Sequence, residues 1–437
     1  MFSRSLFSQD SWTLDDCVNY ALNHNLQLND FEYNTESSRE TKRQSFRDIL
    51  PLIQGRSKYS ISYGRSIDPN DNSFVNTDFF TNEYALEASL DLFQGFQKLN
   101  TIKASKFIHK ATKEETLQQK YLLGFRVMRA FYDIQFTEGL IAIAEKQLVV
   151  SRTNYDLVKK QIDLGLKAEA DLFEAESLLL TDKLNVTQSK NQWKEAKLIL
   201  MQEMNLEGVN DISIQKELVK NTNITNGTIP QSDSIYVEAK NFIPIIKAQE
   251  YRAEAAKKQI AVERGALYPS LVLEGAYGTG FFETIIDASG STVPFKDQFR
   301  NNTFQYIGLS LIVPISNAWS SRSKVKQKKI EYLRAQNNLK TQHQELYQTI
   351  QTLVQEYNAL TVEYEQSTKK MEAQQLAFVI AQKKYERGLL NAISLFTAKN
   401  NLANAQNENL QVRLRLEINK STLDFYRGLP VFNIKNK

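Results

Sequence analysis

Residues 97–163 and 320–387 contain no proline, and this absence constrains the fold more than any other feature of the sequence. Proline interrupts a helix because it lacks an N–H group and clashes with the preceding turn, so nothing of this kind stops either segment. At about 1.5 Å of rise per residue, each uninterrupted helix would be about 100 Å long. Helices of that length do not fit an ordinary globular domain and indicate an elongated assembly.

The two proline-free segments end in the same way. Gly165 follows the first and Gly388 the second, and glycine adopts the left-handed conformation that lets a chain reverse after a helix. The sequences GLKAEADLFEA and GLLNAISLFTA, which start at these glycines, share Gly-Leu, Leu-Phe and Ala at one register. Residues 21–51 and 239–269 also agree, each beginning with Ala and ending with Pro. The sequence therefore predicts two copies of one structural unit.

Each copy also contains two stretches in which apolar and polar residues alternate, the period of a half-buried strand. The clearest is residues 83–92, where Tyr84, Leu86 and Leu90 fall on one face. The acidic side chains of this stretch fall on the other face: Glu83, Glu87 and Asp91. Similar alternation marks residues 53–65, 271–281 and 304–313. Polar, turn-rich segments separate the two strands of each copy, so we expect two β-hairpins.

The predicted order within each copy is helix, strand, strand, very long helix and shorter helix. A segment rich in Asn, Thr, Ser and Gly separates the copies and is expected to be a linker. The expected boundaries are residues 12–205 for the first repeat, with its hairpin at about 52–93; 206–236 for the linker; 237–428 for the second repeat, with its hairpin at about 270–314; and 429–437 for a C-terminal tail.

Composition excludes several classes of function. Charged residues make up 24% of the chain and sum to a net charge of +4, which is too balanced to indicate nucleic-acid binding. A single cysteine, Cys17, allows no disulfide framework, and three scattered histidines predict no metal centre and no cofactor. No catalytic cluster stands out, so we expect no enzyme. No apolar run is long enough for a spanning helix, and the first ten residues predict no signal peptide within this sequence.

The four predicted strands cannot form a stable structure alone. An isolated hairpin with one apolar face is marginal in water, and single-chain barrels begin at about eight strands. Strands of about ten residues with alternating faces match those of outer-membrane barrels. Because only a closed barrel satisfies the backbone of strands in lipid, we expect several copies of the chain to complete one barrel, with the long helices extending from it.

The chain resembles the TolC-like outer-membrane efflux proteins over nearly its whole length. The resemblance lies in the duplicated layout, in WTLDDCVNYAL near the start, in LDLFQGF and LIVPISNAW before the long helices, and in the two G-L-x5-L-F-x-A turns. It implies a mainly α fold with a small β part: a homotrimer whose twelve-stranded β-barrel lies in outer-membrane lipid and continues as a twelve-helix α-barrel in the periplasm. It further implies a passive exit duct of a tripartite efflux or type I secretion system, recruited by a periplasmic adaptor and an inner-membrane pump.

The turns between the helices of each pair would form the periplasmic tips, where the family meets its adaptor. The residues concerned are Leu164, Gly165, Leu166, Arg387, Gly388 and Leu389. An exposed leucine beside a glycine offers a small apolar knob to a partner helix. The alternative is an ordinary helix C-cap with its usual apolar contact.

The resemblance also implies a gate near the tips, closed by polar ties between a tyrosine before the second tip and an aspartate after the first. Tyr385 and Asp171 stand at these positions, and Glu174 shares a helix face with Asp171. Ser394 and Thr397 replace the family's second acidic pair, and Leu390 replaces its basic tie. These residues form the predicted periplasmic gate, with plain surface polarity as the alternative.

Glu83, Glu87 and Asp91 are expected to face the lumen, where they would favour cations or merely keep the wall hydrated. A soluble or peripheral coiled-coil scaffold remains the alternative to a duct. It would stay in solution without detergent as a monomer or dimer. Neither the cargo nor the pump follows from the sequence.

Overall fold

The computed structural model describes residues 11–68, 72–76, 78–215, 231–432 and 434. Its elements are α1 (Leu14–His24), α2 (Leu26–Arg47), β1 (Leu52–Ser62), β2 (Arg65–Ile67), β3 (Phe74–Asn76), β4 (Phe79–Gln94), α3 (Gln97–Asp163), α4 (Glu169–Met204), α5 (Ser232–Ala239), α6 (Pro244–Gly265), β5 (Ser270–Phe282), α7 (Phe295–Asn301), β6 (Phe304–Ile312), α8 (Ser320–Glu386) and α9 (Ala392–Tyr426). The chain is mainly helical with a small sheet, as predicted. Much of the expected linker and the end of the expected tail lie outside the described residues.

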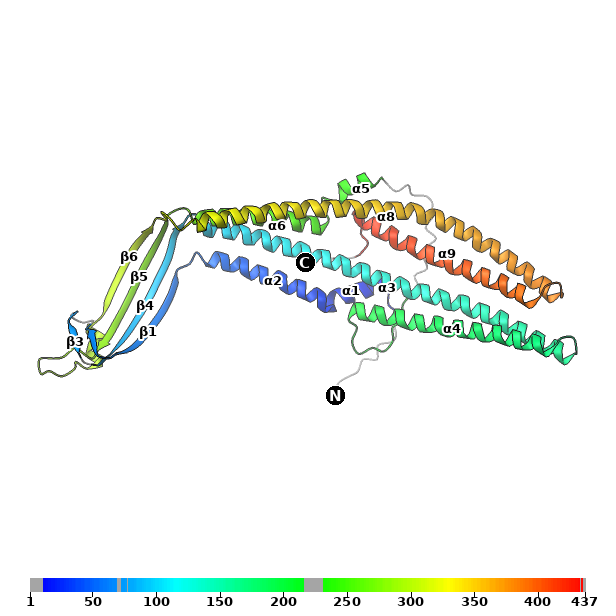
Figure 1. The fold of residues 1–437 in the computed structure, drawn as a ribbon, viewed down its shortest axis with the longest axis horizontal. Helices are drawn as coiled ribbons and strands as arrows, with labels where there is room; N and C mark the ends of the chain where they lie inside the picture. Colours follow the sequence, from blue (N-terminus) through cyan, green and yellow to red (C-terminus); the bar gives the residue numbers. More distant parts are fainter. Residues whose placement is uncertain (1–10, 69–71, 77, 216–230, 433, 435–437) are drawn as a thin grey trace. The chain divides into compact units, whose positions relative to one another are not determined.

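The two long helices match the proline-free segments. α3 and α8 each contain 67 residues. Each is followed by a shorter helix, and these two shorter helices, α4 with 36 residues and α9 with 35, are similar in length to each other. Figure 1 shows α3 reversing into α4 and α8 reversing into α9. We call these pairs the α3–α4 hairpin and the α8–α9 hairpin.

Two helices, α1 and α2, stand where the sequence predicted one helix before the first strand, and Asn25 lies between them. The Asn25 backbone is extended, and its side-chain oxygen accepts a hydrogen bond of 3.0 Å from the Leu28 N–H at the start of α2. Its amide nitrogen donates to the Glu203 carbonyl at 3.0 Å. Asn25 thus ends α1 and caps α2. α1 itself starts with a complete capping box between Thr13 and Asp16.

The chain divides into two compact units. The sheet unit comprises residues 35–112 and 249–339, and the helical unit comprises residues 1–34, 113–248 and 340–437. Each unit combines residues from both predicted repeats. The predicted repeat boundaries therefore describe the order of the sequence, and these units describe the packing.

One four-stranded antiparallel sheet, in the order β1-β4-β5-β6, forms the main β part of the sheet unit (Figure 1). β2 and β3 pair in a separate two-stranded sheet. The sequence predicted two hairpins, and the structure joins them through β4 and β5. β1 and β6 are the edges of this sheet, and each leaves one row of backbone groups without a strand partner among the described residues.

The two faces of the sheet differ in polarity. Opposite residues of antiparallel strands share a face, so Leu86, Tyr277 and Leu273 lie on one face with Ile307 and Leu309. The other face carries Arg56 and Glu87, which form an ion pair of 2.8 Å. Large side chains on the apolar face are exposed, with Leu309 at 62% and Ile307 at 86%. An apolar face of this size needs a partner surface or lipid.

α7 protects the far end of β5, where β6 does not reach. The buried Gln298 side chain accepts from the Phe282 N–H at 2.9 Å and donates to the Phe282 carbonyl at 3.0 Å. Asn302 donates to the Gly280 carbonyl at 2.9 Å. These side chains replace the backbone partners that another strand would supply.

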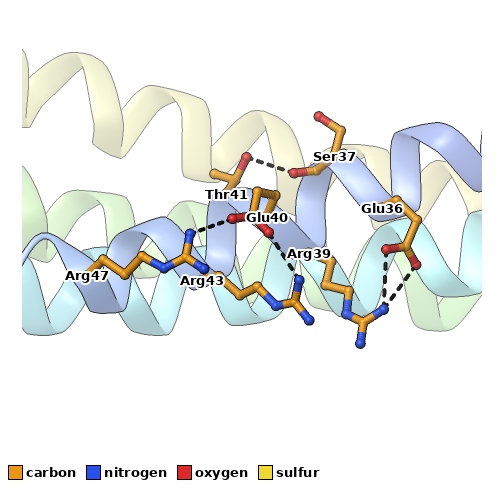
Figure 2. Close-up of polar contacts among 7 residues, drawn as sticks. All are labelled: Glu36, Ser37, Arg39, Glu40, Thr41, Arg43 and Arg47. Carbon is orange, nitrogen blue, oxygen red and sulfur yellow. Dashed lines mark hydrogen bonds and ion pairs between the residues drawn. The ribbon is translucent and has the colours of Figure 1, made fainter.

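Part of α2 lies in the sheet unit and packs on α3 through hydroxyl groups rather than a broad apolar core. The buried Ser45 hydroxyl shares a hydrogen bond of 2.8 Å with Ser105, and Ser38 shares one of 2.8 Å with Thr112. Its outer face carries the ion pairs of Glu40 with Arg43, at 3.2 Å, and with Arg47, at 2.6 Å (Figure 2). The hydrogen bond from Arg43 is the main cause that lowers the pKa of Glu40, and the hydrogen bond from Arg47 lowers it further. Glu40 with Arg43 and Glu36 with Arg39 are i, i+3 pairs, which support the helix in so polar a segment.

The largest apolar core of the helical unit lies where α1, α3 and α4 meet. Val18 of α1, Phe131 of α3 and Leu200 of α4 are buried together with Ile212. Cys17 lies in the same cluster, and burial raises the pKa of its thiol to about 12. This core fixes one end of the α3–α4 hairpin and leaves the tip at the other end.

Candidate functional site

The two tips, Leu164–Gly165–Leu166 and Arg387–Gly388–Leu389, have the same backbone geometry. Gly165 and Gly388 have φ angles of +73° and +70°. The Leu166 N–H donates to the Gln161 carbonyl at 2.8 Å, and the Leu389 N–H donates to the Lys384 carbonyl at 2.8 Å. The Gly165 N–H donates to the Ile162 carbonyl and the Gly388 N–H to the Tyr385 carbonyl, which completes a Schellman motif at each tip. The predicted C-caps are therefore present.

The leucines of the tips do not make the burying contact that often accompanies this motif. Leu164 is 73% exposed, Leu166 71% and Leu389 71%. Arg387 is exposed as well. The tips thus combine a hydrogen-bonded turn with exposed apolar side chains.

Tyr385 lies one residue before the end of α8 and is buried, at 9% exposure. It packs in an apolar cluster with Phe378, Leu395 and Leu402. Its hydroxyl has no hydrogen-bond partner among the described residues. Burial is the main cause that raises the Tyr385 pKa, and the negative charges of Asp171 and Glu174 raise it further. The structure therefore brings Tyr385 within electrostatic range of both predicted gate acids without a hydrogen bond to either.

The Ser394 backbone and the Thr397 hydroxyl make local hydrogen bonds in the first turns of α9. The Ser394 N–H donates to the Asn391 side chain at 2.9 Å, which caps α9. The exposed Thr397 hydroxyl donates to the Ile393 carbonyl at 2.9 Å. Asp171 is half-buried and Glu174 exposed, both near the start of α4. Tyr385, Asp171 and Glu174 of the predicted set thus interact electrostatically within one chain.

Sequence reasoning missed a second polar cluster deeper in the helical unit, which we call the buried triad: Ser151 of α3, Asp182 of α4 and Lys399 of α9. The Lys399 ammonium donates to the Ser151 hydroxyl at 2.7 Å and pairs with the Asp182 carboxylate. Ser151 donates to the same carboxylate at 2.5 Å. All three are buried, with Lys399 at 1% exposure and Asp182 at 3%.

A sequence signal for the buried triad did exist. Lys399 falls between Leu395 and Leu402 at spacings of four and three, so it continues the apolar stripe of α9. A lysine in such a stripe needs an acidic partner on a neighbouring helix. Burial lowers the Lys399 pKa, and the hydrogen bond to Asp182 opposes that shift.

The acidic residues of β4 lie on the polar face of the sheet, yet they do not stand alone. Glu87 accepts from Gln54 at 3.0 Å in addition to its pair with Arg56. Asp91 pairs with Lys98 at 2.8 Å, and Glu83 lies opposite Lys58 in the β1–β4 register. Each acidic residue therefore has a basic neighbour that reduces its field.

The described residues show neither a helix suited to cross a membrane nor a metal-binding cluster. None of the helices in this part of the chain is long and apolar enough to cross a membrane. The described residues also contain no group of three His, Cys, Asp or Glu side chains placed to hold a metal ion.

The chain is similar to known proteins in sequence and in fold. The family model of outer membrane efflux proteins matches residues 17–205 and 235–429. SepC, a probable efflux pump outer membrane protein of Pseudomonas putida, is 22% identical over 268 residues, which cover 60% of this chain and 53% of SepC. TtgF, the toluene efflux pump outer membrane protein of another Pseudomonas putida strain, matches to the same extent. The matched part of the chain thus spans about half the length of these relatives.

Solved structures show the same fold over nearly the whole chain. A CusC structure has a TM-score of 0.80 at 18% identity and covers 97% of this chain and 96% of its own. The CmeC outer membrane channel of Campylobacter jejuni has a TM-score of 0.81 at 16% identity, with coverage of 95% and 85%. Since the family model spans most of both halves, the location predicted from the sequence is confirmed, and the chain belongs to the outer membrane efflux protein family.

Proposed function

We propose that this protein is the outer-membrane exit duct of a tripartite efflux or type I secretion system and performs no chemistry itself. The observation that carries this proposal is the four-stranded sheet, which has an exposed apolar face, a polar face with ion pairs and two open edges. In lipid, these edges need partners, because an unpaired backbone group there costs several kcal/mol. Family membership agrees with this reading and argues against a soluble scaffold.

Three copies of the chain would close the sheet into a barrel. The β1 edge of one copy would pair with the β6 edge of the next, so four strands from each of three copies give a twelve-stranded barrel. The equal lengths of α3 and α8 and the similar lengths of α4 and α9 support a duplicated unit and a twelve-helix barrel. The apolar face of the sheet would then meet lipid, and the polar face would line the lumen.

The tips are the proposed contact for a periplasmic adaptor, which would link the duct to an inner-membrane pump. Leu164, Leu166 and Leu389 would enter apolar sites on the adaptor. The Schellman turns support this role because they hold the leucines outward at little entropic cost. Arg387, beside Gly388, would add a charge contact.

The gate is proposed at Tyr385, Asp171 and Glu174, close to the tips. In the trimer, acidic residues from three copies would form a ring, and the carboxylates would repel one another unless cations or neighbouring donors balance them. Ser394 and Thr397 would contribute polarity without charge, and the Thr397 hydroxyl already donates to the Ile393 carbonyl. Along the barrel, Glu83, Glu87 and Asp91 would give a weak preference for cations, weakened by their basic neighbours.

Conductance of the purified protein in a planar lipid bilayer tests the proposal. We expect discrete current steps of one size, with a resting conductance below that of an open barrel because the tips are closed. A trimeric preparation that never conducts, even with Asp171 and Glu174 both replaced by Ala, would refute the duct. The cargo class would follow from the pump, which is a separate polypeptide.

A further inference from the structure

Lys399 has an environment that the proposed duct does not by itself require. It is the least exposed charged side chain of the described residues, and both of its polar partners belong to the α3–α4 hairpin while it belongs to the α8–α9 hairpin. The Phe396 ring lies 4.7 Å from the ammonium. The buried triad is thus a hydrogen-bonded, charged connection between two hairpins, which also meet through apolar contacts such as Leu157 with the Leu395 cluster and through Lys167 over the Tyr385 ring.

Stability alone does not account for this arrangement. Replacing a buried ion pair by apolar side chains is often neutral or stabilising, because two charges must be removed from water. Separating the partners without replacing them is different, since it leaves uncompensated charges in an apolar seam. A buried pair therefore distinguishes sharply between the state in which the helices touch and a state in which they have moved apart.

The other buried polar side chains near the triad, on α3 and α9, do little to favour the state in which the two hairpins touch over the state in which they are apart. Gln147 and Asn154 lie one turn before and one turn after Ser151 on α3, and both are buried. Their side-chain oxygens have no hydrogen-bond partner among the described residues, and the same holds for Gln406, two turns beyond Lys399 on α9. Because these amides are incompletely satisfied when the hairpins touch, they favour the touching state only weakly. The triad is the strongly directional contact in this seam.

The position of the triad connects it to both tips. Asp182 follows the start of α4 at Glu169, and Lys399 follows the start of α9 at Ala392. At about 1.5 Å per residue, the triad lies about 20 Å along α4 and about 10 Å along α9. A partner that moves one tip relative to the other would pull directly on this pair through two continuous helices.

We infer that the buried triad is a latch: it holds the α8–α9 hairpin against the α3–α4 hairpin in the resting duct, and opening of the duct separates Lys399 from Asp182. This inference rests on the proposed function. It assigns Lys399, Asp182 and Ser151 as positioning residues, which act on the gate through the helices and not by contact with cargo.

The test compares resting conductance of purified trimers in planar bilayers. Lys399→Met and Asp182→Asn should each raise the open fraction about tenfold, as coupled residues of a strong pair do. The exchanged pair Asp182→Lys with Lys399→Asp should conduct less than either single variant, because it restores the attraction. Ser151→Ala, which keeps the ion pair, should give a smaller rise and provides a milder variant if the single charge variants do not assemble.

The matched control is Glu408→Gln. It removes an exposed ion pair with Lys370, at 2.6 Å, that lies within the α8–α9 hairpin. This variant should conduct like the unmodified protein. A rise of the same size in the control would show that the conductance responds to any lost charge pair and would overturn the latch.

A second readout separates the latch from the function on which it rests. Spin labels on cysteines introduced at the exposed positions Lys183 and Asn401 report the distance between α4 and α9 beside the triad. Cys17 will not take the label, since it is buried and its pKa is about 12. The distance should lengthen in Lys399→Met whether or not the protein conducts. An unchanged distance and conductance in an assembled Lys399→Met trimer overturns the latch, whereas an unmodified protein that never conducts overturns the duct.

Discussion

Replacement of Leu309 by arginine tests whether the apolar face of the sheet meets lipid. Leu309 lies on β6 opposite Leu273 of β5, on the apolar face, and is 62% exposed in the single chain. If this face met water, the substitution would change the free energy of unfolding by no more than about 0.5 kcal/mol. If it meets the hydrocarbon of the membrane, arginine near mid-strand costs about 2–4 kcal/mol.

The trimer enlarges this difference, because each of three copies carries the substitution. The proposed barrel would lose about 6–12 kcal/mol in total, enough to prevent assembly or to leave it marginal. Ser310→Arg is the matched control. It places the same charge one residue further along β6, opposite Val272 on the polar face, where the lumen would hydrate it.

The assay is urea-dependent unfolding from lipid vesicles, followed by the fluorescence of the three tryptophans. Leu309→Arg should fail to insert or should unfold at much lower urea concentration, whereas Ser310→Arg should stay close to the unmodified protein. Equal effects of the two substitutions would contradict the assignment of the faces. A tolerated Leu309→Arg would contradict the membrane barrel itself.

Three further predictions concern the tips and the gate. Asp171→Ala should raise resting conductance, since it removes a charge that faces Tyr385, and an unchanged conductance would remove Asp171 from the gate. Tyr385→Phe should leave the melting temperature unchanged or slightly raised, because the lost hydroxyl has no partner among the described residues and an unpaired buried hydroxyl costs about 1–3 kcal/mol. The folded-state pKa of Tyr385 is raised, so any contribution of its proton to stability is lost only in alkaline solution, and the two proteins should behave alike at neutral pH; a clear loss of stability would reveal a hydrogen bond in the trimer. Leu389→Ser should leave trimer stability within about 0.5 kcal/mol, since Leu389 is 71% exposed, while weakening adaptor binding measured by surface plasmon resonance; unaltered binding would exclude this tip from the contact.

The long helices could be predicted because their signal is local. Two local features suffice to define α3 and α8: neither segment contains proline, and a glycine follows each end. Both glycines adopt the left-handed conformation that their position requires. The alternation in residues 83–92 likewise identified β4 and separated Leu86 from Glu87 correctly. Hydrophobic periodicity and the positions of proline and glycine depend only on residues that are close in sequence, so they can be recognised without knowing any tertiary contact.

Contacts between distant segments could not be predicted in this way. The pairing of β4 with β5 joins residues that are far apart in sequence, and the sequence of neither strand indicates which strand it pairs with. Asn25 divides the first helix because its amide reaches Glu203, a residue near the end of α4. The buried triad depends on three helices, so only the lysine in the apolar stripe of α9 hinted at it.

The mass of the purified protein in detergent, measured by native mass spectrometry, tests the central claim most directly. The sheet has two open edges and an exposed apolar face, and in the proposed barrel three copies supply four strands each. The account predicts a detergent-dependent species of three times 50.2 kDa extracted from the outer membrane. A monomer or dimer that stays in solution without detergent would contradict it.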